Sequence, residues 1–455
     1  MGFAMSSIRD FGAKGDGKAD DTEALVHAVE QGDGEVVLPR GDYRITRPVV
    51  VPLEKFGRLS ISGSGGTAKL IMAGVGPALH LVGTHKKTAA PQDFAEGVWQ
   101  KERLPTVTDL EIVGDHENAD GIRLDGVMQP TLRGVLIRKC RHGIHLVNRN
   151  RNVLIADCHI YHNRGVGIFL DHVNLHQTNI HGSHISYNLQ GGIVVRNGEV
   201  RNLHICSNDI EYNYDLKAND SADIWLDARK GTIREGTIVG NTIQAKISPG
   251  GANVRLTGVG KENPNAVGMF SISGNLIGSQ ETNLHLDACR GITISGNAVY
   301  HGEKFAVRAK DCEHLVFSGN SHDHNPDYKG KSTDAFLFEN CRRLQLTGLI
   351  VQHTHAEGEP AESTMTFAGC SFTSLAACQL LDVRRKGLRF RDCSVVRVAE
   401  CTIRGGGDNF DEPIGVNEGT RDVMIVNNFL SVGKSGRLSL GRRNDVRIDG
   451  NMLLL

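Results

Sequence analysis

Three aspartates in the middle of the chain have a spacing that suits acid–base chemistry. Asp171 and Asp227 occupy the same place in two short segments, "GIFLD" and "DIWLD", and Asp223 begins the second of them. Residues alternate in these segments as they do in strands, so every second side chain shares one outward face. Two parallel strands apart, the backbones at Asp171 and Asp227 would lie about 9–10 Å from each other. Tilted carboxyls would then reach the ~6.5–9.5 Å separation of a general acid and a general base that share a water.

Aromatic and basic side chains are expected on the same outward face. Because Ile224 and Leu226 point into a core, Trp225 is predicted to lie in water, on the face that Asp223 and Asp227 share. Aromatic rings stack on sugar faces, and arginines bind carboxylates or sulfates through paired hydrogen bonds. The outward residues that lie between the two core residues of each strand form a column, which we name the first column. This column predicts a groove for an acidic polysaccharide, and the alternative is a face that loops cover and whose rings are buried. From strand to strand the first column holds Arg123, His145, Phe169, Val194, Trp225, Arg255, His285 and Arg308.

The second column consists of the outward residues two positions further along each strand, and it places a cation between two of the aspartates. Arg196 between Asp171 and Asp227 would hold one carboxylate ionised while the other acts as the acid. The alternative is an Asp–Arg–Asp ladder that only neutralises itself. The second column holds Asp125, Val147, Asp171, Arg196, Asp227, Thr257, Asp287 and Lys310.

A long segment enters beside the tryptophan. Residues 211–222, "EYNYDLKANDSA", lengthen their repeat to 31 residues, against 22 to 25 in the preceding repeats. Long loops on rigid scaffolds commonly carry binding residues, so Tyr212 is expected to line a subsite or to act as a base. Arg229 and Lys230 would neutralise a uronate carboxylate, which makes the neighbouring C5 proton acidic enough for β-elimination.

A repeat of short strands must position these residues. No helical segment separates the strands, so a single repeat cannot bury its apolar face, and stacked repeats must do so. The sequence therefore predicts an all-β fold, a right-handed parallel β-helix of about 13 coils. A strand with the pattern "G-I-x-L" or a variant of it starts at residues 121, 143, 167, 192, 223, 253, 283, 306, 335, 364, 387, 413 and 437.

Two ladders of in-register residues support the stacking. Thiols in register indicate a core stack, and asparagines in register bond the backbone of successive turns. We expect both ladders to be structural and the 10 cysteines to be reduced rather than disulfide-bonded. The cysteine ladder is Cys289, Cys312, Cys341, Cys370 and Cys393, and the asparagine ladder is Asn241, Asn275, Asn297, Asn320 and Asn451.

The first hundred residues are organised differently. "DDTEALVHAVEQG" predicts a short amphipathic helix that begins after Asp20 or Asp21, ends at Gly32 and caps the open end of the stack. Residues 84–104 lack alternation, hold Trp99 and are expected to form a long loop. We therefore expect a cap with the first coils over residues 1–104 and the parallel β-helix over residues 105–455, continuous with the cap.

Charge and hydropathy narrow the range of partners. Lys plus Arg number 51 and Asp plus Glu 52, and this net charge of −1 gives no reason to expect nucleic acid. No apolar run reaches the length of a membrane span, so no membrane partner is expected. The N-terminal "MGFAMSSIRDFG" lacks the apolar core of a signal peptide, which fits a cytoplasmic protein or a secreted one whose signal has been removed. A cluster of histidines between residues 159 and 184 is expected to be an exposed ladder rather than a metal site. A coil stack of this length is compatible with a monomer or a trimer.

The N-terminal motifs carry a family resemblance. "FGAKGDGKADDTEAL" followed by "GEVVLPRGDYRI" resembles the signature of the pectate-lyase-like β-helix superfamily, which includes polygalacturonases, rhamnogalacturonase-like proteins, some phage tailspikes and certain epimerases. Members that act on sugars usually bind polysaccharide in a groove along one parallel sheet. The resemblance to family 28 hydrolases is partial: "NADG" places Asp120 at one of three expected carboxylates, but Arg141 and His142 replace the acid pair.

The favoured hypothesis is therefore a glycoside hydrolase acting on an acidic or complex polysaccharide, with Asp171, Asp223 and Asp227 sharing the acid and base roles. The alternatives are a polysaccharide lyase with a Tyr, His or Lys base and arginine assistance, and a non-catalytic glycan-binding protein of the tailspike type. No cofactor is expected for the hydrolase, and Ca²⁺ is expected only for a lyase.

Overall fold

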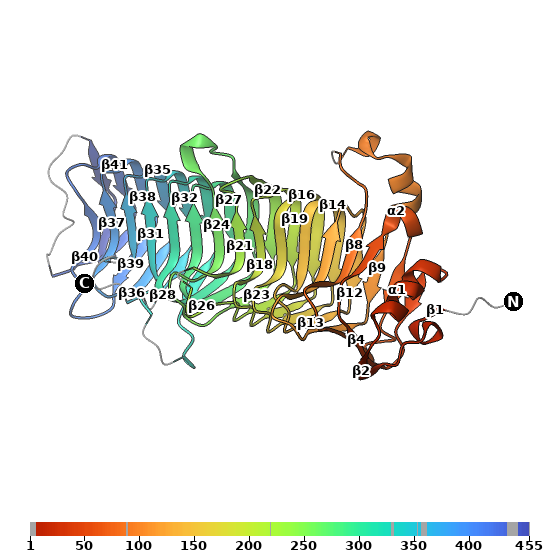
Figure 1. The fold of residues 1–455 in the computed structure, drawn as a ribbon. Coiled ribbons are helices and arrows are strands. Elements are labelled where there is room, and N and C mark those ends of the chain that lie inside the picture. The colour runs from red at the N-terminus through yellow and green to blue at the C-terminus, as the bar shows by residue number, and fades with distance from the viewer. Residues whose placement is uncertain are drawn as a thin grey trace. The chain divides into compact units, whose positions relative to one another are not determined.

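The computed structural model of the chain describes residues 6–87, 90–218, 220–328, 332–352, 354–355, 362–434 and 445–454. Its residues form two compact units. The first unit comprises Met1–Asp215 and Asp223–Gly236, and the second comprises Leu216–Ala222 and Thr237–Leu455. Each unit is a parallel β-helix in which successive coils stack their strands in register (Figure 1).

The first face of the stack carries the predicted anchor strands. In each strand the inward residues are aliphatic; Ile122, Ile144, Ile168, Ile193 and Ile224 pair in register and are fully buried. This stacked column removes apolar surface from water at every coil, which a single coil cannot do. In the first unit the strands are β5 (Val49–Pro52), β8 (Gly76–Val82), β11 (Ala119–Asp125), β14 (Ile144–Ala156), β16 (Val166–His181), β18 (Gly191–Arg196) and β21 (Ala222–Asp227). In the second unit they are β24 (Ala252–Thr257), β26 (Leu276–Asp287), β28 (Ala298–Lys310), β31 (Ala335–Glu339), β34 (Met365–Ala368), β37 (Lys386–Arg391) and β40 (Glu412–Val416).

The second face follows in each coil, and the long strands β14 and β16 bend to enter it. In the first unit it continues through β3 (Glu35–Val37), β6 (Ser60–Ser62), β9 (Thr106–Thr108), β12 (Thr131–Arg133), β19 (Glu199–Cys206) and β22 (Thr232–Val239), with β1 (Ser6–Ser7) paired to β3. In the second unit it consists of β25 (Val267–Ser273), β27 (Arg290–Ser295), β29 (Glu313–Ser318), β32 (Arg342–Thr347), β35 (Ser371–Ala376), β38 (Ser394–Ala399), β41 (Arg421–Val426) and β43 (Val446–Asp449).

The third face closes each coil. Its strands in the first unit are β2 (Asp16–Asp20), β4 (Gly41–Ile45), β7 (Ala68–Met72), β10 (Glu111–Gly114), β13 (Leu136–Arg138), β15 (His159–Tyr161), β17 (His184–Ser186) and β20 (Asp209–Glu211). Those in the second unit, where β26 and β28 also contribute their first residues, are β23 (Thr242–Gln244), β30 (Ser321–Asp323), β33 (Ile350–Val351), β36 (Gln379–Val383), β39 (Thr402–Gly405), β42 (Phe429–Ser431) and β44 (Met452–Leu454).

Single residues in the left-handed conformation make the corners between faces. Lys139, His162, Tyr187 and Tyr212 occupy the same corner in four successive coils, with φ between 53° and 57°. Such a residue bends the chain without a loop but costs strain, which the repeated backbone pairing on either side offsets. The corner also aligns the next residue of each coil, and in the first unit that residue is Cys140, Asn163, Asn188 or Asn213.

Asparagine ladders run through the corners of both units. In the second unit the predicted ladder is confirmed: Asn241 Nδ2 donates to Asn275 Oδ1 at 2.9 Å, and the same bond recurs to Asn297 and Asn320. Asn451 instead pairs with Asn428 at 2.9 Å. The cysteine ladder is also confirmed, with the Cys289 N–H donating to Cys312 Sγ at 3.4 Å and all five thiols buried. All 10 cysteines are free.

The N-terminal end carries the predicted helical cap. Helix α1 (Thr22–Gln31) lies at this end of the first unit and buries Leu25 and Val29 (Figure 1). Residues 84–104, expected to be a long loop, also contain short helical turns, η2 (Pro91–Asp93) and η3 (Val98–Glu102). The buried carboxylate of Glu102 anchors η3, because it accepts hydrogen bonds from the backbone N–H and the hydroxyl of Thr84. The other short helices are η1 (Ile8–Phe11), α2 (Leu53–Phe56) and η4 (Gly260–Glu262).

The predicted number of coils was too low. The chain makes about 16 turns rather than 13, because the coils before residue 121 lack the "G-I-x-L" pattern yet pair in register with those that follow. The anchor strand expected at residue 437 lies outside the described residues.

Candidate active site

The pairing of the first-face strands confirms the two outward columns in the first unit. The first column aligns Arg123, His145, Phe169, Val194 and Trp225, and it continues backward to His80. The second column aligns Asp125, Val147, Asp171, Arg196 and Asp227. Within the second unit, Arg255, His285 and Arg308 align in the same way.

The prediction that Trp225 lies in water was wrong. The residue stands on the outward face as the register requires, but it is only 5% exposed. The guanidiniums of Arg196 and Arg229 lie 5.3 and 5.9 Å from its ring centroid and cover it through cation–π contacts. Phe169 is buried in the same way, stacked on His145 with ring centroids 5.2 Å apart. Both rings are therefore buried, as the alternative expected, but neighbouring side chains rather than a loop cover them.

Asp223 is part of the scaffold rather than of an open face. Its side chain is fully buried, and its Oδ1 accepts hydrogen bonds at 3.1 Å from both the backbone N–H and the side-chain amide of Asn213. Asn213 is the last member of an asparagine ladder that also contains Asn163 and Asn188. Asp223 therefore occupies the place where the next asparagine of this ladder would stand.

Asp227 is buried and ion-paired. Both of its carboxylate oxygens accept from Arg229, at 2.9 Å from Nε and 2.6 Å from Nη2, and Arg196 Nε lies 3.9 Å away. Asp227 and its two arginines thus neutralise one another, as the alternative for the second column expected.

Asp171 is the accessible carboxylate of the three, and two histidines flank it. His172 Nδ1 lies 2.7 Å from Asp171 Oδ1, and His145 Nε2 lies 3.5 Å from Oδ2. The carboxylate side chain is 26% exposed and that of His172 is 67% exposed, so water and solutes reach this pair. Burial lowers the pKa of His145 in spite of the nearby charges of Asp120 and Asp171, so its ring is neutral at pH 7. The sequence offered His172 only as one of a histidine cluster, because nothing in its spacing showed that it turns back onto Asp171.

A third buried carboxylate is that of Asp120. Asp120 accepts from Arg141 Nε and Nη2 at 2.9 and 2.6 Å and from the backbone N–H of His142 at 3.0 Å. Burial lowers the pKa of His142 to about 4, and its Nδ1 accepts from the Val166 N–H at 3.1 Å. The proton of the neutral ring is therefore on Nε2. His142 packs against both His145 and Phe169, at centroid distances of 5.3 and 5.1 Å, and these two rings also stack on each other. Because Asp120 holds the backbone of His142, it helps to position all three rings.

Two further predicted binding residues lie apart from Asp171. Tyr212 stacks on Tyr187 at a centroid distance of 5.2 Å, in an exposed ladder at the corner after the third face that also includes His162. Lys230 is exposed just after β21. Their predicted roles in binding stay predictions.

A pocket in the second unit contains the other predicted basic residues. It has a volume of about 480 Å³, and Arg255, His285, Lys304 and Arg308 line it together with Phe305 and Leu337. His285 Nε2 lies 3.0 Å from Asp287 Oδ2. Burial would raise the pKa of Asp287, but the hydrogen bond to His285 and the surrounding cations lower it overall. Glu281 and Glu339 also line the pocket and pair with Lys304 at 3.0 Å and with Arg308 at 3.8 Å, so part of its positive charge is neutralised.

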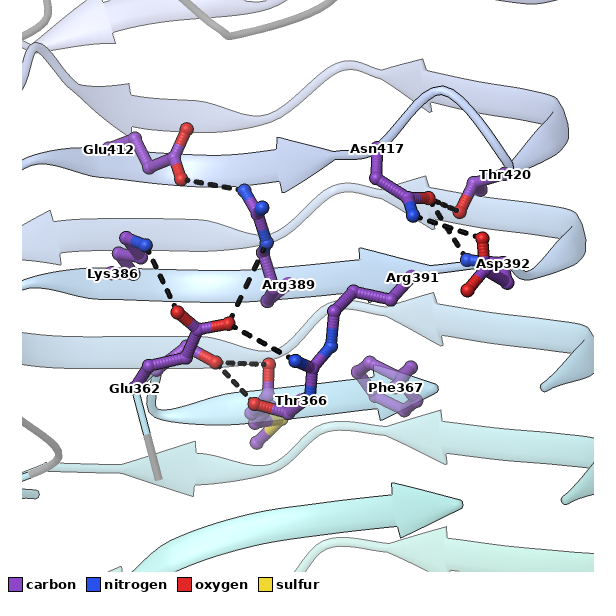
Figure 2. Close-up of polar contacts among 12 residues, drawn as sticks. Glu362, Thr366, Phe367, Lys386, Arg389, Arg391, Asp392, Glu412, Asn417 and Thr420 are labelled. Carbon is purple, nitrogen blue, oxygen red and sulfur yellow. Dashed lines mark hydrogen bonds and ion pairs between the residues drawn. The ribbon is translucent and has the colours of Figure 1, made fainter. Parts of the chain in front are cut away.

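A dense polar network elsewhere in the second unit is structural. Glu362 lies 3.3 Å from Lys386 Nζ, 3.9 Å from Arg389 Nε and 3.7 Å from Arg391 Nη1, and Arg389 also pairs with Glu412 at 3.3 Å (Figure 2). Burial would raise the pKa of Glu362, but these cations lower it overall. Every carboxylate in this network has a cationic partner, so neither glutamate is placed to donate a proton.

Histidines outside the groove form ladders. His159 and His184 stack with ring centroids 5.1 Å apart on the third face, and His184 Nδ1 lies 3.2 Å from Asp209. Across the residues that the structure describes, no group of three or more His, Cys, Asp or Glu side chains is arranged to hold a metal ion. Within the same residues, no helix is long and apolar enough to cross a membrane.

Family models match two stretches of the chain. Residues 101–243 match the right-handed β-helix region, and residues 5–88 match the rhamnogalacturonase A/epimerase, pectate-lyase-like model. Both matches confirm the resemblance to the pectate-lyase-like superfamily of right-handed parallel β-helices.

Individual similar proteins are distant from this chain. Alginate lyase 7 of Azotobacter vinelandii is 34% identical over 126 residues, which are 26% of this chain and 14% of that protein. The chain thus spans only a small part of this relative. The Dettilon tailspike protein has 14% identity and a TM-score of 0.52 over 81% of this chain and 68% of its own. The A-module of the Azotobacter vinelandii mannuronan C-5 epimerase AlgE4 has 14% identity and a TM-score of 0.40 over 99% and 97% of the two chains.

Proposed function

We propose that the chain is a carbohydrate-active enzyme that acts on an acidic polysaccharide and that its chemistry takes place at Asp171 and His172. The observation that carries the proposal is the 2.7 Å contact between these side chains on the outward face, beside Arg196. A relative named as an alginate lyase, with 34% identity over part of the chain, supports an acidic substrate.

The geometry favours β-elimination over hydrolysis. When Asp171 accepts the Nδ1–H of His172, the Nε2 lone pair of this ring is free to take a proton from a ligand. In β-elimination His172 would remove the C5 proton of a uronate whose carboxylate Arg196 neutralises. The electrons of the C–H bond form the C4–C5 double bond, the C4–O bond breaks, and the leaving oxygen takes a proton from the protonated His172 or from water.

A glycoside hydrolase is the second candidate, because Asp171 and Asp227 share one column with Arg196 between them. In that mechanism Asp171, the accessible carboxylate, would be the base or the acid. Asp227 would have to exchange its bond to Arg229 for the substrate, and Asp223 would have to leave the asparagine ladder. Both steps cost hydrogen bonds that elimination at His172 does not require.

Product analysis with matched variants tests the proposal. We expect the protein to release unsaturated oligosaccharides, which absorb in the far ultraviolet, from a polyuronate such as alginate or polygalacturonate. His172→Ala and Asp171→Asn should each lower the rate by about 10²–10⁴-fold, the range for loss of a general base. His184→Ala is the matched control, because His184 forms an exposed pair with Asp209 on the third face of the same unit. It should retain full activity.

The other outcomes identify the alternatives. New reducing ends without a double bond would establish the hydrolase, and binding without either product would establish a tailspike-like binding protein. Each would overturn the proposed elimination. Calcium, which the sequence left open for a lyase, is tested by running the same assay with and without a chelator.

A further inference from the structure

The second face of the first unit carries a column of cations that is separate from the two outward columns of the first face. Arg151, His176 and Arg201 pair in register on β14, β16 and β19, and Arg149 lies two residues before Arg151. Burial lowers the pKa of Arg201, and Arg234 on β22 is close enough to lower it further. Because β14 bends between faces, it presents His145 to the groove and these two arginines to a different side of the coil.

These arginines have too few acidic partners. Glu199 lies 3.6 Å from Arg201, and the other carboxylates that act on the column are Asp93 and Glu235. Among the described residues, four arginines face these three carboxylates, which leaves positive charge on the column. Within the described residues, Arg151 Nη1 is buried and makes no hydrogen bond, and the same is true of Arg234 Nε.

The pKa directions agree with this excess of charge. Burial lowers the pKa of Arg149, and the neighbouring charge of Arg151 lowers it further. Burial also lowers the pKa of His176, and Arg149, Arg201 and Arg151 add to the effect. Cations that destabilise one another in this way are stabilised by an anion.

An aromatic stack extends from the arginines to solvent. The guanidinium of Arg149 lies 3.5 Å from His85 Nε2, and His85 stacks on Phe94 at a centroid distance of 4.3 Å. Arg151 lies over Phe94 at 4.9 Å, and Phe94 stacks on Trp99 at 5.5 Å. Trp99 keeps 42% of its surface exposed, whereas Trp225 is buried. The arginine over the Trp99 ring itself is Arg103, at 5.6 Å, and Arg151 reaches this ring only through Phe94. A partly exposed indole in cationic surroundings combines stacking on a sugar ring with binding of its charged group.

We propose that Trp99, Arg149 and Arg151 form a second binding site, separate from the groove, for an acidic saccharide. The sugar ring would lie against Trp99, and its carboxylate would bind the partly exposed side chains of Arg149 and Arg151. The site holds a polyuronate chain without reacting with it, and it does not depend on the chemistry at His172.

The two tryptophans allow a direct test. In a Trp225→Phe, His172→Ala protein, emission comes from Trp99 alone and the ligand is not cleaved. We expect an alginate-derived hexauronate to change this emission saturably, and neutral cellohexaose and inorganic phosphate to produce no such change at the same concentrations. Adding Arg151→Ala should weaken the hexauronate response at least tenfold. Arg47→Ala, which removes an exposed arginine paired with Glu23 at the cap, is the matched control and should leave it unchanged.

A second measurement does not depend on any arginine variant. Because the surroundings of Trp99 are cationic, iodide should quench its emission more strongly than caesium, and the hexauronate should reduce the iodide quenching. An unchanged emission, an equal response to cellohexaose, saturation by phosphate alone, or equal quenching by the two ions would each overturn the proposed site. None of these results bears on whether His172 acts as a base.

Discussion

At the scale of single residues, Trp225 and Trp99 have opposite roles in the same unit. Trp225 is held under Arg196 and Arg229, so removing its ring leaves a cavity beneath two guanidiniums. We expect Trp225→Ala to lower the free energy of unfolding by about 3–5 kcal/mol. Trp99→Ala removes an exposed ring and should change it by less than about 1 kcal/mol. Urea unfolding of the two variants checks this, and equal losses would contradict the burial of Trp225.

Residue alternation predicted the face of each side chain but not what covers it. The period of two placed Trp225, Asp171 and Asp227 in the correct columns, since a slip of one residue would have exposed the isoleucine core. Burial of Trp225 depends on Arg229, which curls back from beyond the strand, and no pattern encodes that path. Asp171 was found from its column, whereas the turn of His172 toward it came only with coordinates.

At the scale of elements, the asparagine ladders join one coil to the next. Asn188 Oδ1 accepts from the backbone and the side chain of Asn163, and its Nδ2 donates to Asn213 and to the Ile160 carbonyl. Asn188→Ala leaves these buried groups without partners, so we expect a loss of about 2–4 kcal/mol in the free energy of unfolding. Asn265→Ala, at an exposed position, is the control and should cost less than about 0.5 kcal/mol. Equal effects in denaturant unfolding would show that the ladder contributes nothing.

The sequence revealed one asparagine ladder and missed the other. The ladder of the second unit was visible because each asparagine follows a glycine, which readily adopts the left-handed corner. In the first unit the corner residues are His162, Tyr187 and Tyr212, which rarely adopt that conformation, so "HN" and "YN" gave no signal. Asp223 ends this ladder. Because the ladder itself gave no signal in the sequence, Asp223 was predicted to lie on the outward face instead.

At the scale of the whole molecule, thiol reactivity reports on the core of both units. All 10 cysteines are free and nine are buried, with Cys206 half-buried. Burial raises the pKa of Cys140 to about 12 and that of Cys158 to about 11, so neither forms a thiolate at neutral pH. We expect a thiol reagent at pH 7 to label Cys206 alone in the native protein and all ten cysteines in denaturant. Rapid native labelling of the ladder cysteines, identified by mass spectrometry, would contradict a packed core.

Acid should weaken the fold through histidines that are buried in their neutral form. The pKa of His142 falls from 6.5 to about 4 in the folded chain, chiefly through burial, and that of His85 behaves in the same way. Below pH 6.5 these rings bind protons in the unfolded chain, whereas in the folded chain they stay neutral down to about pH 4. The free energy of unfolding therefore decreases as the pH is lowered from 6.5 to about 4. Each ring accounts for at most about 3 kcal/mol.

His142→Asn tests the share that one ring contributes to this acid sensitivity. The side-chain carbonyl of the asparagine can still accept the hydrogen bond from the Val166 N–H, but it does not titrate. The free energy of unfolding of this variant should therefore fall less between pH 7 and pH 4.5 than that of the unsubstituted protein. His27→Asn, at an exposed position on α1, is the control and should keep the original slope. Urea unfolding at several pH values gives the slopes directly. Parallel curves for His142→Asn and the unsubstituted chain would mean that the His142 ring is already protonated in the folded state. The interpretation of His142 as a neutral ring packed against Phe169 and His145 would then be wrong.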